Sequence, residues 1–438
     1  MRFSSLEHVF PRTAKINSLG HLEIAGVDTL ELAEEFGTPL YLFCEESLRQ
    51  QCRTFIEEFR GLHRQTDVAY AAKAYLGPAL AKLLQEEGLG LDVVSGGELA
   101  VAEAVNFPAE RIYFHGNNKS PEELERALAY GVGYIVVDNL HELRILEGLA
   151  KDQNRQQSIL IRVTPGVDAH THVHTTTGTL DSKFGLPLAT GQAEEALRMA
   201  LASRYLILKG LHFHLGSPLF ELEPYATAID IVLAFAARFR EEGLQLQEFS
   251  PGGGFAIAYT RDQQPPSVAE YAETIVSAIR QGCDSYGLSM PRIVVEPGRA
   301  IVGPAGVALY TVGAIKEIPG VRTFASVDGG MGDNIRPALY DAQYEVVVAG
   351  RVEEEPTMLV TIAGKYCESG DILVRNANLP SLIPGDLLAI PASGAYAPAM
   401  ASNYNMNPRP AMVMLKDGHA RLIRQRGTLE GMLKDDIW

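Results

Sequence analysis

Eight short apolar runs separated by helix-like segments most constrain how this chain can fold. They are rich in Val, Ile and Leu and lie at about 68–72, 91–94, 112–114, 134–137, 158–163, 208–214, 247–250 and 292–295. Runs of this kind between helices are typical of a parallel sheet that is buried on both faces. Eight strand–helix units in about 250 residues favour a (β/α)8 barrel, with a doubly wound open sheet as the structural alternative.

The pattern changes after about residue 305. Strand-like segments joined by Gly, Asp, Asn and Pro turns now follow one another, at 307–318, 324–327, 344–351, 358–363, 387–391 and 412–415. They predict a separate all-β domain, to which the N-terminal stretch 16–27 is expected to add. A chain of 438 residues is long enough for two domains. We therefore predict a barrel over residues 36–300 and a β-sandwich or β-barrel domain made of residues 1–35 and 301–438.

Charge and cysteine content limit the partners of the chain. Acidic residues outnumber basic residues by 54 to 38, which gives a formal charge of −16. This excess argues against nucleic acid or an anionic membrane as the main partner, while a local basic pocket for an anionic small molecule stays compatible with it. The four cysteines form no CxxC pair, and the first residues lack the apolar core of a signal peptide. No stretch predicts a membrane span. Because the cysteines are sparse, a reduced compartment fits best, and we expect a cytoplasmic location.

Polar and reactive residues follow the predicted barrel strands at the points where the strands end. They are Lys73, Asp92 with Ser95 and Glu98, His115, His214 with Ser217, Gly252–Gly254, and Glu296 with Arg299. In a (β/α)8 barrel the loops after the strands carry the active site. No position decides the function alone, but their shared place in the repeat indicates one common site.

Several of these features match parts of one cofactor. The backbone N–H groups of Gly252–Gly254 can approach a phosphate closely, and Arg299 can bind the same oxyanion through two parallel hydrogen bonds. A partly desolvated lysine such as Lys73 can form a Schiff base, and Glu296 can pair with a protonated ring nitrogen. Each residue also has a plain structural explanation, as a turn, a surface lysine or a salt-bridge partner. Together with a stacking histidine they describe pyridoxal 5′-phosphate (PLP).

The other histidines receive weaker interpretations. His212 and His214 share one face of a strand, so a metal pair is conceivable, but structural or ring-stacking roles fit better. His170, His172 and His174 alternate in a loop rich in Thr and Gly, and we assign them no role. The sequence therefore predicts no metal site.

Longer motifs run through the chain in a fixed order. In the barrel they are Tyr70-Ala71-Ala72-Lys73-Ala74, Asp92-Val93-Val94-Ser95-Gly96-Gly97-Glu98, His115-Gly116-Asn117-Asn118-Lys119-Ser120, Asp181-Ser182-Lys183-Phe184-Gly185, His212-Phe213-His214-Leu215-Gly216-Ser217, Gly252-Gly253-Gly254 and Glu296-Pro297-Gly298-Arg299. In the β domain they are Asn334-Ile335-Arg336-Pro337-Ala338-Leu339-Tyr340, Cys367-Glu368-Ser369-Gly370-Asp371, Gly394-Ala395-Tyr396 and Met400-Ala401-Ser402-Asn403-Tyr404-Asn405. Over about residues 15–425 the chain thus resembles the fold-type III PLP enzymes and, within them, the diaminopimelate decarboxylase family. It departs from many members at Pro218, where Gln is common, and carries Ile335 beside the substrate arginine.

The resemblance implies how PLP would be bound. Lys73 would hold the cofactor, His214 would stack on its ring, and Glu296 would keep the ring nitrogen protonated. The other cofactor-binding residues would be Asp92, Ser217, Gly252, Gly253, Gly254, Gly298, Arg299 and Tyr396.

The resemblance also implies a reaction, the release of carbon dioxide from meso-2,6-diaminopimelate to leave L-lysine, the last step of lysine biosynthesis. Cys367 would protonate the carbanion, with Lys73 as the second candidate. Family members are usually homodimers with shared active sites, in which Cys367 and Glu368 come from the partner. The substrate-binding residues would be Arg299, Arg336, Tyr340, Glu368 and Tyr396.

Two other functions stay open at this point. Relatives that decarboxylate ornithine, lysine, arginine or carboxynorspermidine often carry an acidic residue at the position of Arg336. A catalytically silent PLP-binding homologue would typically lack Lys73 or Cys367. Both residues are present, and Arg336 is followed by Pro337-Ala338-Leu339-Tyr340, so the sequence favours diaminopimelate.

Overall fold

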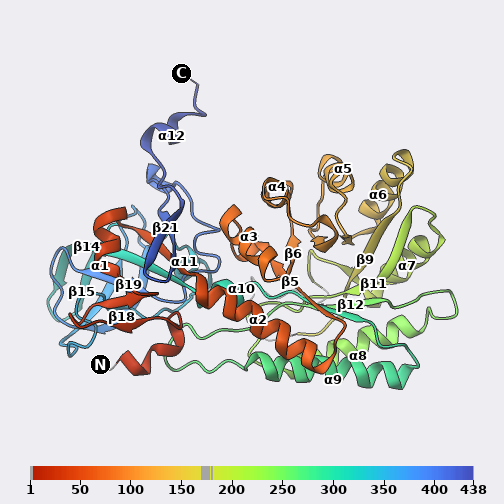
Figure 1. Cartoon of the computed structure of the whole chain (residues 1–438), viewed down its shortest axis with the longest axis horizontal. Helices are drawn as coiled ribbons and strands as arrows, with labels where there is room; N and C mark the ends of the chain where they lie inside the picture. Colours follow the sequence, from red (N-terminus) through yellow and green to blue (C-terminus); the bar gives the residue numbers. More distant parts are fainter. Residues whose placement is uncertain (1–2, 169–177, 179–180, 438) are drawn as a thin grey trace. The chain divides into compact units, whose positions relative to one another are not determined.

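The computed structural model describes residues 3–168, 178 and 181–437 (Figure 1). The chain divides into two compact units. The barrel unit comprises residues 51–256 and 265–298, and the β unit comprises residues 1–50, 257–264 and 299–438.

Eight parallel strands form the closed barrel of the barrel unit. Each strand pairs with the next along the chain, and the ring closes because the last strand pairs with the first. The strands are β5 (Thr66–Ala71), β6 (Gly90–Val93), β7 (Ile112–Phe114), β8 (Tyr134–Val137), β9 (Gln157–Thr164), β11 (Leu206–His212), β12 (Glu248–Gly252) and β13 (Arg292–Val295), with the short β10 (Leu186–Pro187) beside β9. The predicted barrel is confirmed, and closure of the ring excludes the open sheet.

Helices on the outside of the barrel cover the outer face of the strands, which explains why apolar residues predominate in them (Figure 1). Ile135, Val136 and Val137 of β8 are all fully buried, as expected for a strand covered on both faces. The helices are α3 (Pro78–Glu86), α4 (Gly96–Ala104), α5 (Pro121–Tyr130), α6 (Leu140–Asp152), α7 (Gln192–Ala202), α8 (Glu223–Ala237) and α9 (Val268–Tyr286). Their ends follow from sequence: Ser120 and Glu123 form a capping box at the start of α5, and Gly131 ends it in the left-handed conformation.

The β unit is built on a mostly antiparallel sheet. Its strands are β4 (Leu40–Cys44), β14 (Gly306–Ile318), β15 (Arg322–Val327), β16 (Val347–Val348), β17 (Met358–Ala363), β18 (Ile372–Leu379), β19 (Leu387–Ile390), β20 (Ala411–Lys416) and β21 (His419–Arg424). Among its described strands, only the pairs β4–β20 and β15–β17 are parallel. The N-terminal strands β1 (Lys15–Ile16), β2 (Leu22–Ile24) and β3 (Val27–Asp28) form a small sheet of their own.

The remaining helices are short, apart from α2. The α-helices of the β unit are α1 (Thr29–Phe36), α10 (Arg299–Val302), α11 (Arg336–Tyr340) and α12 (Leu429–Leu433), while α2 (Glu45–Leu62) spans the limit between the units. Single turns of 3-10 helix occur at Phe3–Ser5, Glu7–Val9, Ala72–Ala74, Ala109–Arg111, Leu188–Thr190 and Tyr404–Met406.

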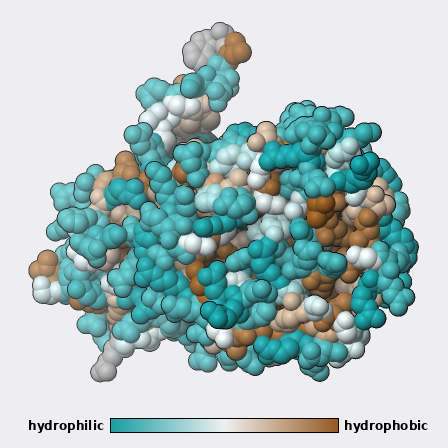
Figure 2. Space-filling model, turned by 45° about the vertical axis from the view of Figure 1, so that its right-hand side comes forward, coloured by the Kyte–Doolittle hydropathy of each residue, from teal (hydrophilic) through white to brown (hydrophobic). Residues whose placement is uncertain are grey.

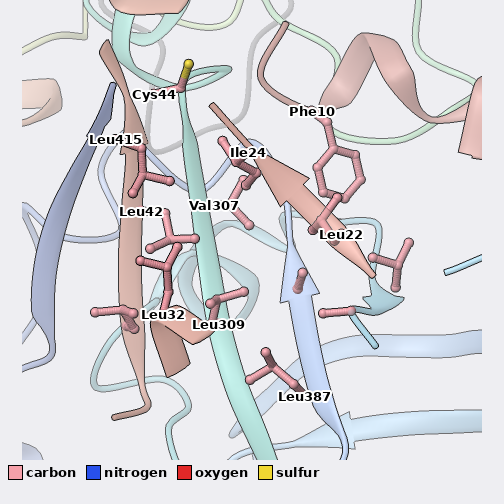
Figure 3. Packing of buried hydrophobic residues seen from close by; sticks show 14 of the residues in the cluster. Phe10, Leu22, Ile24, Leu32, Leu42, Cys44, Val307, Leu309, Leu387 and Leu415 are labelled. Carbon is pink, nitrogen blue, oxygen red and sulfur yellow. The ribbon is translucent and has the colours of Figure 1, made fainter. Parts of the chain in front are cut away.

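The apolar core of the β unit joins the N-terminal segment to the later strands (Figure 3). Leu22 and Ile24 of β2 are fully buried with Leu42 of β4, Val307 of β14 and Leu387 of β19. The N-terminal segment thus completes the β unit by packing on this core, while its strands pair among themselves.

Strand β4 places the limit between the units later than the predicted domain limit at residue 36. It pairs with β14 and β20 of the β sheet, so the β unit continues to residue 50. All five residues of β4 are buried, which gives no alternation by which to recognise a strand of an open-faced sheet. Of the predicted strand 344–351, only Val347–Val348 pairs as β16, while β18 and β21 were not predicted.

The surface is mainly hydrophilic over the face shown in Figure 2, with hydrophobic residues scattered among polar ones. Among the large hydrophobic residues that are exposed are Leu19, Val321 and Leu359. A search of the described residues finds no helix with the length and apolar character needed to cross a membrane.

Candidate active site

The carboxyl ends of five barrel strands carry a group of buried polar side chains. Because parallel strands of a barrel all end at the same rim, residues at their ends meet there. They are Asp92 of β6, His115 after β7, His212 of β11, Ser250 of β12 and Glu296 after β13, and all are buried.

Glu296 is the centre of this group. One carboxylate oxygen, Oε2, lies 3.0 Å from Nε2 of His212, and the other, Oε1, accepts a hydrogen bond of 2.9 Å from the Ser250 hydroxyl. Nε2 of His115 lies 3.4 Å from Oε1. Burial opposes the charge of Glu296, but the two imidazoles outweigh it and hold the pKa of this carboxyl well below its usual value. Glu296 is therefore anionic.

His212 supplies its hydrogen bond as a neutral ring. Burial lowers its pKa to about 4, against the opposing effect of Glu296. Nδ1 of His212 is buried and has no hydrogen-bond partner among the described residues. An unpaired buried N–H group at this atom would cost more free energy than an unpaired lone pair, so Nδ1 is the unprotonated nitrogen. The proton therefore resides on Nε2 and points at Glu296.

Two further carboxyl groups near the site have pKa values that are raised, in contrast to that of Glu296. Burial raises the pKa of Asp92, whose Oδ1 lies 3.8 Å from Nε2 of His115. Burial, with a contribution from the charge of Asp92, raises the pKa of Glu98 to about 7, although its Oε2 accepts a hydrogen bond of 2.7 Å from the backbone N–H of Val94. These carboxyls gain protons far more readily than Glu296.

Lys73 lies in the 3-10 turn that follows β5, and its side chain is exposed. The backbone N–H of Ala71 donates to the carbonyl of Pro297 at 3.1 Å, which ties this turn to the segment after Glu296. Gly298 packs against the same turn, since a Cβ at this position would lie 2.9 Å from Cβ of Ala71 and 3.1 Å from Cβ of Ala74. Gly298 therefore holds the Lys73 turn close to strand β13.

The three glycines after β12 form a tightly packed loop. A Cβ on Gly253 would lie 2.2 Å from the carbonyl oxygen of Glu296, and a Cβ on Gly254 would lie 2.7 Å from that of Gly216. Gly252 and Gly254 also have positive φ angles of 75° and 118°. Only glycine fits at these positions, and the bare backbone can approach a ligand closely.

His214 belongs to this loop region. Its Nδ1 accepts a hydrogen bond of 3.3 Å from the backbone N–H of Gly253. Burial, followed by the charge of Lys73, holds the pKa of His214 well below its usual value, so the ring is neutral. Ser217 is half-buried on the same loop, where the N–H of Leu219 donates to the carbonyl of Gly254 at 2.8 Å.

The barrel residues fit PLP. Three buried polar atoms at the strand ends, Oδ1 of Asp92, Nε2 of His115 and Nδ1 of His212, have no hydrogen-bond partner among the described residues. A glycine loop for a phosphate and an exposed lysine amine complete the set that PLP needs. A metal ion is a second ligand to consider, because the potential metal-binding atoms of His115, His212 and Glu296 lie within 4.8 Å of one another. The contacts of both histidines with Glu296 already account for that spacing.

The β unit holds a second group of interest, which we call the arginine–tyrosine cluster: Tyr259, Arg299, Arg336, Tyr344 and Tyr396. Nη1 of Arg299 donates to the Tyr259 hydroxyl at 2.6 Å, and Nη1 of Arg336 donates to the Tyr344 hydroxyl. The Arg299 guanidinium lies 4.8 Å from the Tyr396 ring centroid. Both arginines are buried, and no carboxylate of the described residues forms an ion pair with Arg336. Buried guanidinium groups of this kind are suited to bind an anion.

The remaining predicted residues lie elsewhere in the β unit. Tyr340 ends α11 and is half-buried, while Cys367 and Glu368 are exposed in the loop between β17 and β18. The backbone N–H of Cys367 donates to Oδ1 of Asn405 at 2.8 Å. Buried Asp371 accepts hydrogen bonds from the N–H groups of Met331 and Tyr366, so this loop has a fixed position.

The structure thus gathers the predicted cofactor residues Asp92, His214, Gly252–Gly254 and Glu296 at one rim of the barrel, and the predicted arginines Arg299 and Arg336 in one cluster. Sequence reasoning missed Ser250 and Tyr259 and gave His115 and His212 no defined role. His212 could have been found, since it shares a strand face with His214, whereas Tyr259 lies beyond a strand end in a segment without a pattern. His170, His172 and His174 lie outside the described residues.

Comparison with known proteins identifies the family. Residues 45–303 match the family model described as "Pyridoxal-dependent decarboxylase, pyridoxal binding domain". The chain is 48% identical to diaminopimelate decarboxylase of Bacillus subtilis, over 97% of each chain, and 42% identical to that of Mycobacterium tuberculosis, over 98% of each. A solved structure of diaminopimelate decarboxylase from M. jannaschii matches with a TM-score of 0.92 at 36% identity, over 98% of each chain.

The barrel, the buried polar residues at its rim and these matches define the chain as a PLP-dependent decarboxylase. Identities of 42% to 48% over nearly the full length place it more narrowly. The chain belongs to the diaminopimelate decarboxylase family, and its cofactor is PLP.

Proposed function

We propose that this chain releases carbon dioxide from meso-2,6-diaminopimelate and leaves L-lysine, with PLP held by Lys73. The observation that carries the proposal is the buried Arg336, which has tyrosines and no carboxylate ion pair around it among the described residues. A substrate with a second amino-acid group at its far end supplies the carboxylate that such a guanidinium requires. The related solved structures from M. jannaschii and Helicobacter pylori with L-lysine bound support this choice.

The barrel residues have separable tasks in this reaction. Bound PLP supplies a sink for the electron pair that remains when carbon dioxide leaves. Glu296, fixed as an anion by Ser250 and His212, would keep a proton on the ring nitrogen of the cofactor. His214, kept in place by the N–H of Gly253, would stack on the ring. Ser217, Gly252–Gly254, Arg299 and Tyr396 would hold the phosphate, and Asp92 and Gly298 would be further cofactor-binding residues.

Residues of the β unit recognise the substrate in this proposal. Arg299, Arg336, Tyr340 and Tyr396 bind it, and the two arginines hold the distal carboxylate. Glu368 binds the distal ammonium group, and Cys367 protonates the carbanion, with Lys73 as the alternative donor. The exposure of Cys367 and Glu368 suits a homodimer in which each subunit supplies both residues to the active site of the other. We place the enzyme in the cytoplasm.

Carbon dioxide release tests the substrate. Purified protein with PLP is given meso-diaminopimelate, L-lysine, L-ornithine or L-arginine at equal concentration. We expect release from meso-diaminopimelate alone, with L-lysine as the product. Release from one of the other three would contradict the assignment of Arg336, and no release from any of them would contradict the whole proposal.

A further inference from the structure

Tyr259 and Tyr344 are the two members of the arginine–tyrosine cluster to which the family resemblance gives no role, and Tyr259 is the one that contacts both arginines. It lies in the segment 257–264, which packs with the β unit, and only 6% of its surface is exposed. Its hydroxyl accepts a hydrogen bond of 2.6 Å from Nη1 of Arg299. The guanidinium carbon of Arg336 lies 4.5 Å from the centroid of its ring. One phenol is therefore held between two buried cations.

The hydroxyl group of Tyr259 accepts a hydrogen bond but has no acceptor for its own proton among the described residues. An arginine can only donate hydrogen bonds, so the Tyr259 oxygen accepts from Arg299 and its own proton needs another acceptor. No described residue accepts that proton. A buried donor without an acceptor costs free energy, and a ligand oxygen would remove that cost.

The surrounding charges suit a negatively charged acceptor. Burial alone would raise the pKa of Tyr259, but Arg299 and Arg336 outweigh burial and lower it. A more acidic phenol is a stronger hydrogen-bond donor to an anion. The ring of Tyr344, edge-on at a centroid distance of 5.3 Å, packs against the Tyr259 ring. The hydroxyl therefore has a defined position beside both arginines.

We propose that Tyr259 is a substrate-binding residue that donates its phenol proton to the distal carboxylate, beside Arg299 and Arg336. The inference rests on the proposed function, since that carboxylate belongs to meso-diaminopimelate and is retained in L-lysine. It makes Tyr259 a determinant of specificity. A ligand with a carboxylate at this end gains the hydrogen bond, and a diamine of the same length does not.

The variant Tyr259→Phe tests this role because it removes one oxygen and keeps the ring. Calorimetric titration of the PLP-loaded enzyme compares L-lysine, which has the carboxylate, with 1,5-diaminopentane, which lacks it. We expect L-lysine to bind about tenfold more weakly to the variant, the loss typical of a hydrogen bond to a charged group, and the diamine to bind unchanged. The KM for meso-diaminopimelate should rise by a similar factor of about ten, with kcat within about twofold.

The matched control is Tyr130→Phe, which removes a hydroxyl that donates to the carbonyl of Phe107 at 2.6 Å in the barrel unit. It should leave both affinities unchanged. Unchanged L-lysine affinity in Tyr259→Phe, equal weakening of both ligands, or loss of PLP binding would each overturn the inference, the last by assigning Tyr259 a structural role. If the wild-type enzyme released no carbon dioxide, the proposed function would fail, while the two titrations would still decide the role of Tyr259.

Discussion

Glu296 and Asp92 show how one site shifts the pKa values of two buried carboxyl groups in opposite directions. Both side chains are buried, which by itself favours the neutral form. Glu296 has the Ser250 hydroxyl and His212 within hydrogen-bond distance, whereas Oδ1 of Asp92 has no hydrogen-bond partner among the described residues. The pKa of Glu296 therefore falls and that of Asp92 rises. Pairs of carboxyls that separate in this way are typical of sites that keep one of them charged for chemistry.

Glu98 leads to a pH-dependent prediction. Its pKa of about 7 in the folded chain lies above the ordinary value of 4.5, so folding favours its protonated form. The stabilisation is complete below the ordinary pKa and is lost as pH rises through about 7. Glu98→Gln resembles the protonated form and keeps an acceptor for the N–H of Val94. We expect the variant to gain about 1–3 kcal/mol of stability over the wild type between pH 5 and pH 8.

Thermal unfolding of the PLP-loaded proteins at several pH values measures this difference. Glu125→Gln is the control, because Glu125 is exposed on α5 and loses the same charge. A difference in melting temperature between Glu98→Gln and wild type that does not change with pH would contradict the assignment.

Among the elements, those that depend on hydrophobic pattern and turn chemistry, the barrel strands and the glycine loop, could be predicted from the sequence. Each barrel strand was located because a strand buried on both faces is a short apolar run, as in Val136 and Val137 of β8. Strand β4 was not predicted, and because it pairs with β14 and β20 it belongs to the β unit, although it lies after the predicted domain limit at residue 36. The glycine loop was recognised because few other sequences permit such close backbone approach. Ser250 and Tyr259 were missed because their roles depend on neighbours distant in sequence, Glu296 and Arg336.

The glycine loop carries the prediction at this scale. Gly253→Ala would place a methyl group 2.2 Å from the carbonyl oxygen of Glu296, so backbone must move. We expect a loss of about 1–3 kcal/mol in stability and weaker PLP binding. Gly148→Ala is the control, because a Cβ there meets nothing within 4 Å in the interior of α6. That variant should be neutral or slightly more stable.

Melting temperature and a PLP titration monitored by absorbance measure both effects. Equal melting temperatures and equal PLP affinities for Gly253→Ala and wild type would show that the loop tolerates a side chain.

At the scale of the whole molecule, the chain divides chemistry between its two units. The barrel unit holds Lys73, Glu296 and the glycine loop, and the β unit holds the arginine–tyrosine cluster and the loop with Cys367 and Glu368. The two units alternate along the chain, because residues 257–264 lie between two barrel segments in the sequence but belong to the β unit. Tyr259 and Arg299 therefore belong to one unit despite the barrel helix α9 between them.

The proposed sharing of active sites between subunits predicts complementation. Lys73→Ala lacks the amine that we propose holds the cofactor, and Glu368→Ala lacks the carboxylate that we propose binds the distal ammonium group, so each homodimer should be nearly inactive. In a mixed dimer with shared sites, one site has both substituted residues and the other has neither. Random mixing makes about half of the dimers mixed and restores one of their two sites, so about a quarter of wild-type activity should return. Two differently tagged variants, mixed and purified through both tags, give the heterodimer directly. Activity near half of wild type in that fraction would support sharing, because only a partner-supplied Glu368 can complete the site that holds Lys73. No recovery in verified heterodimers would place Lys73 and Glu368 of the same subunit in one site.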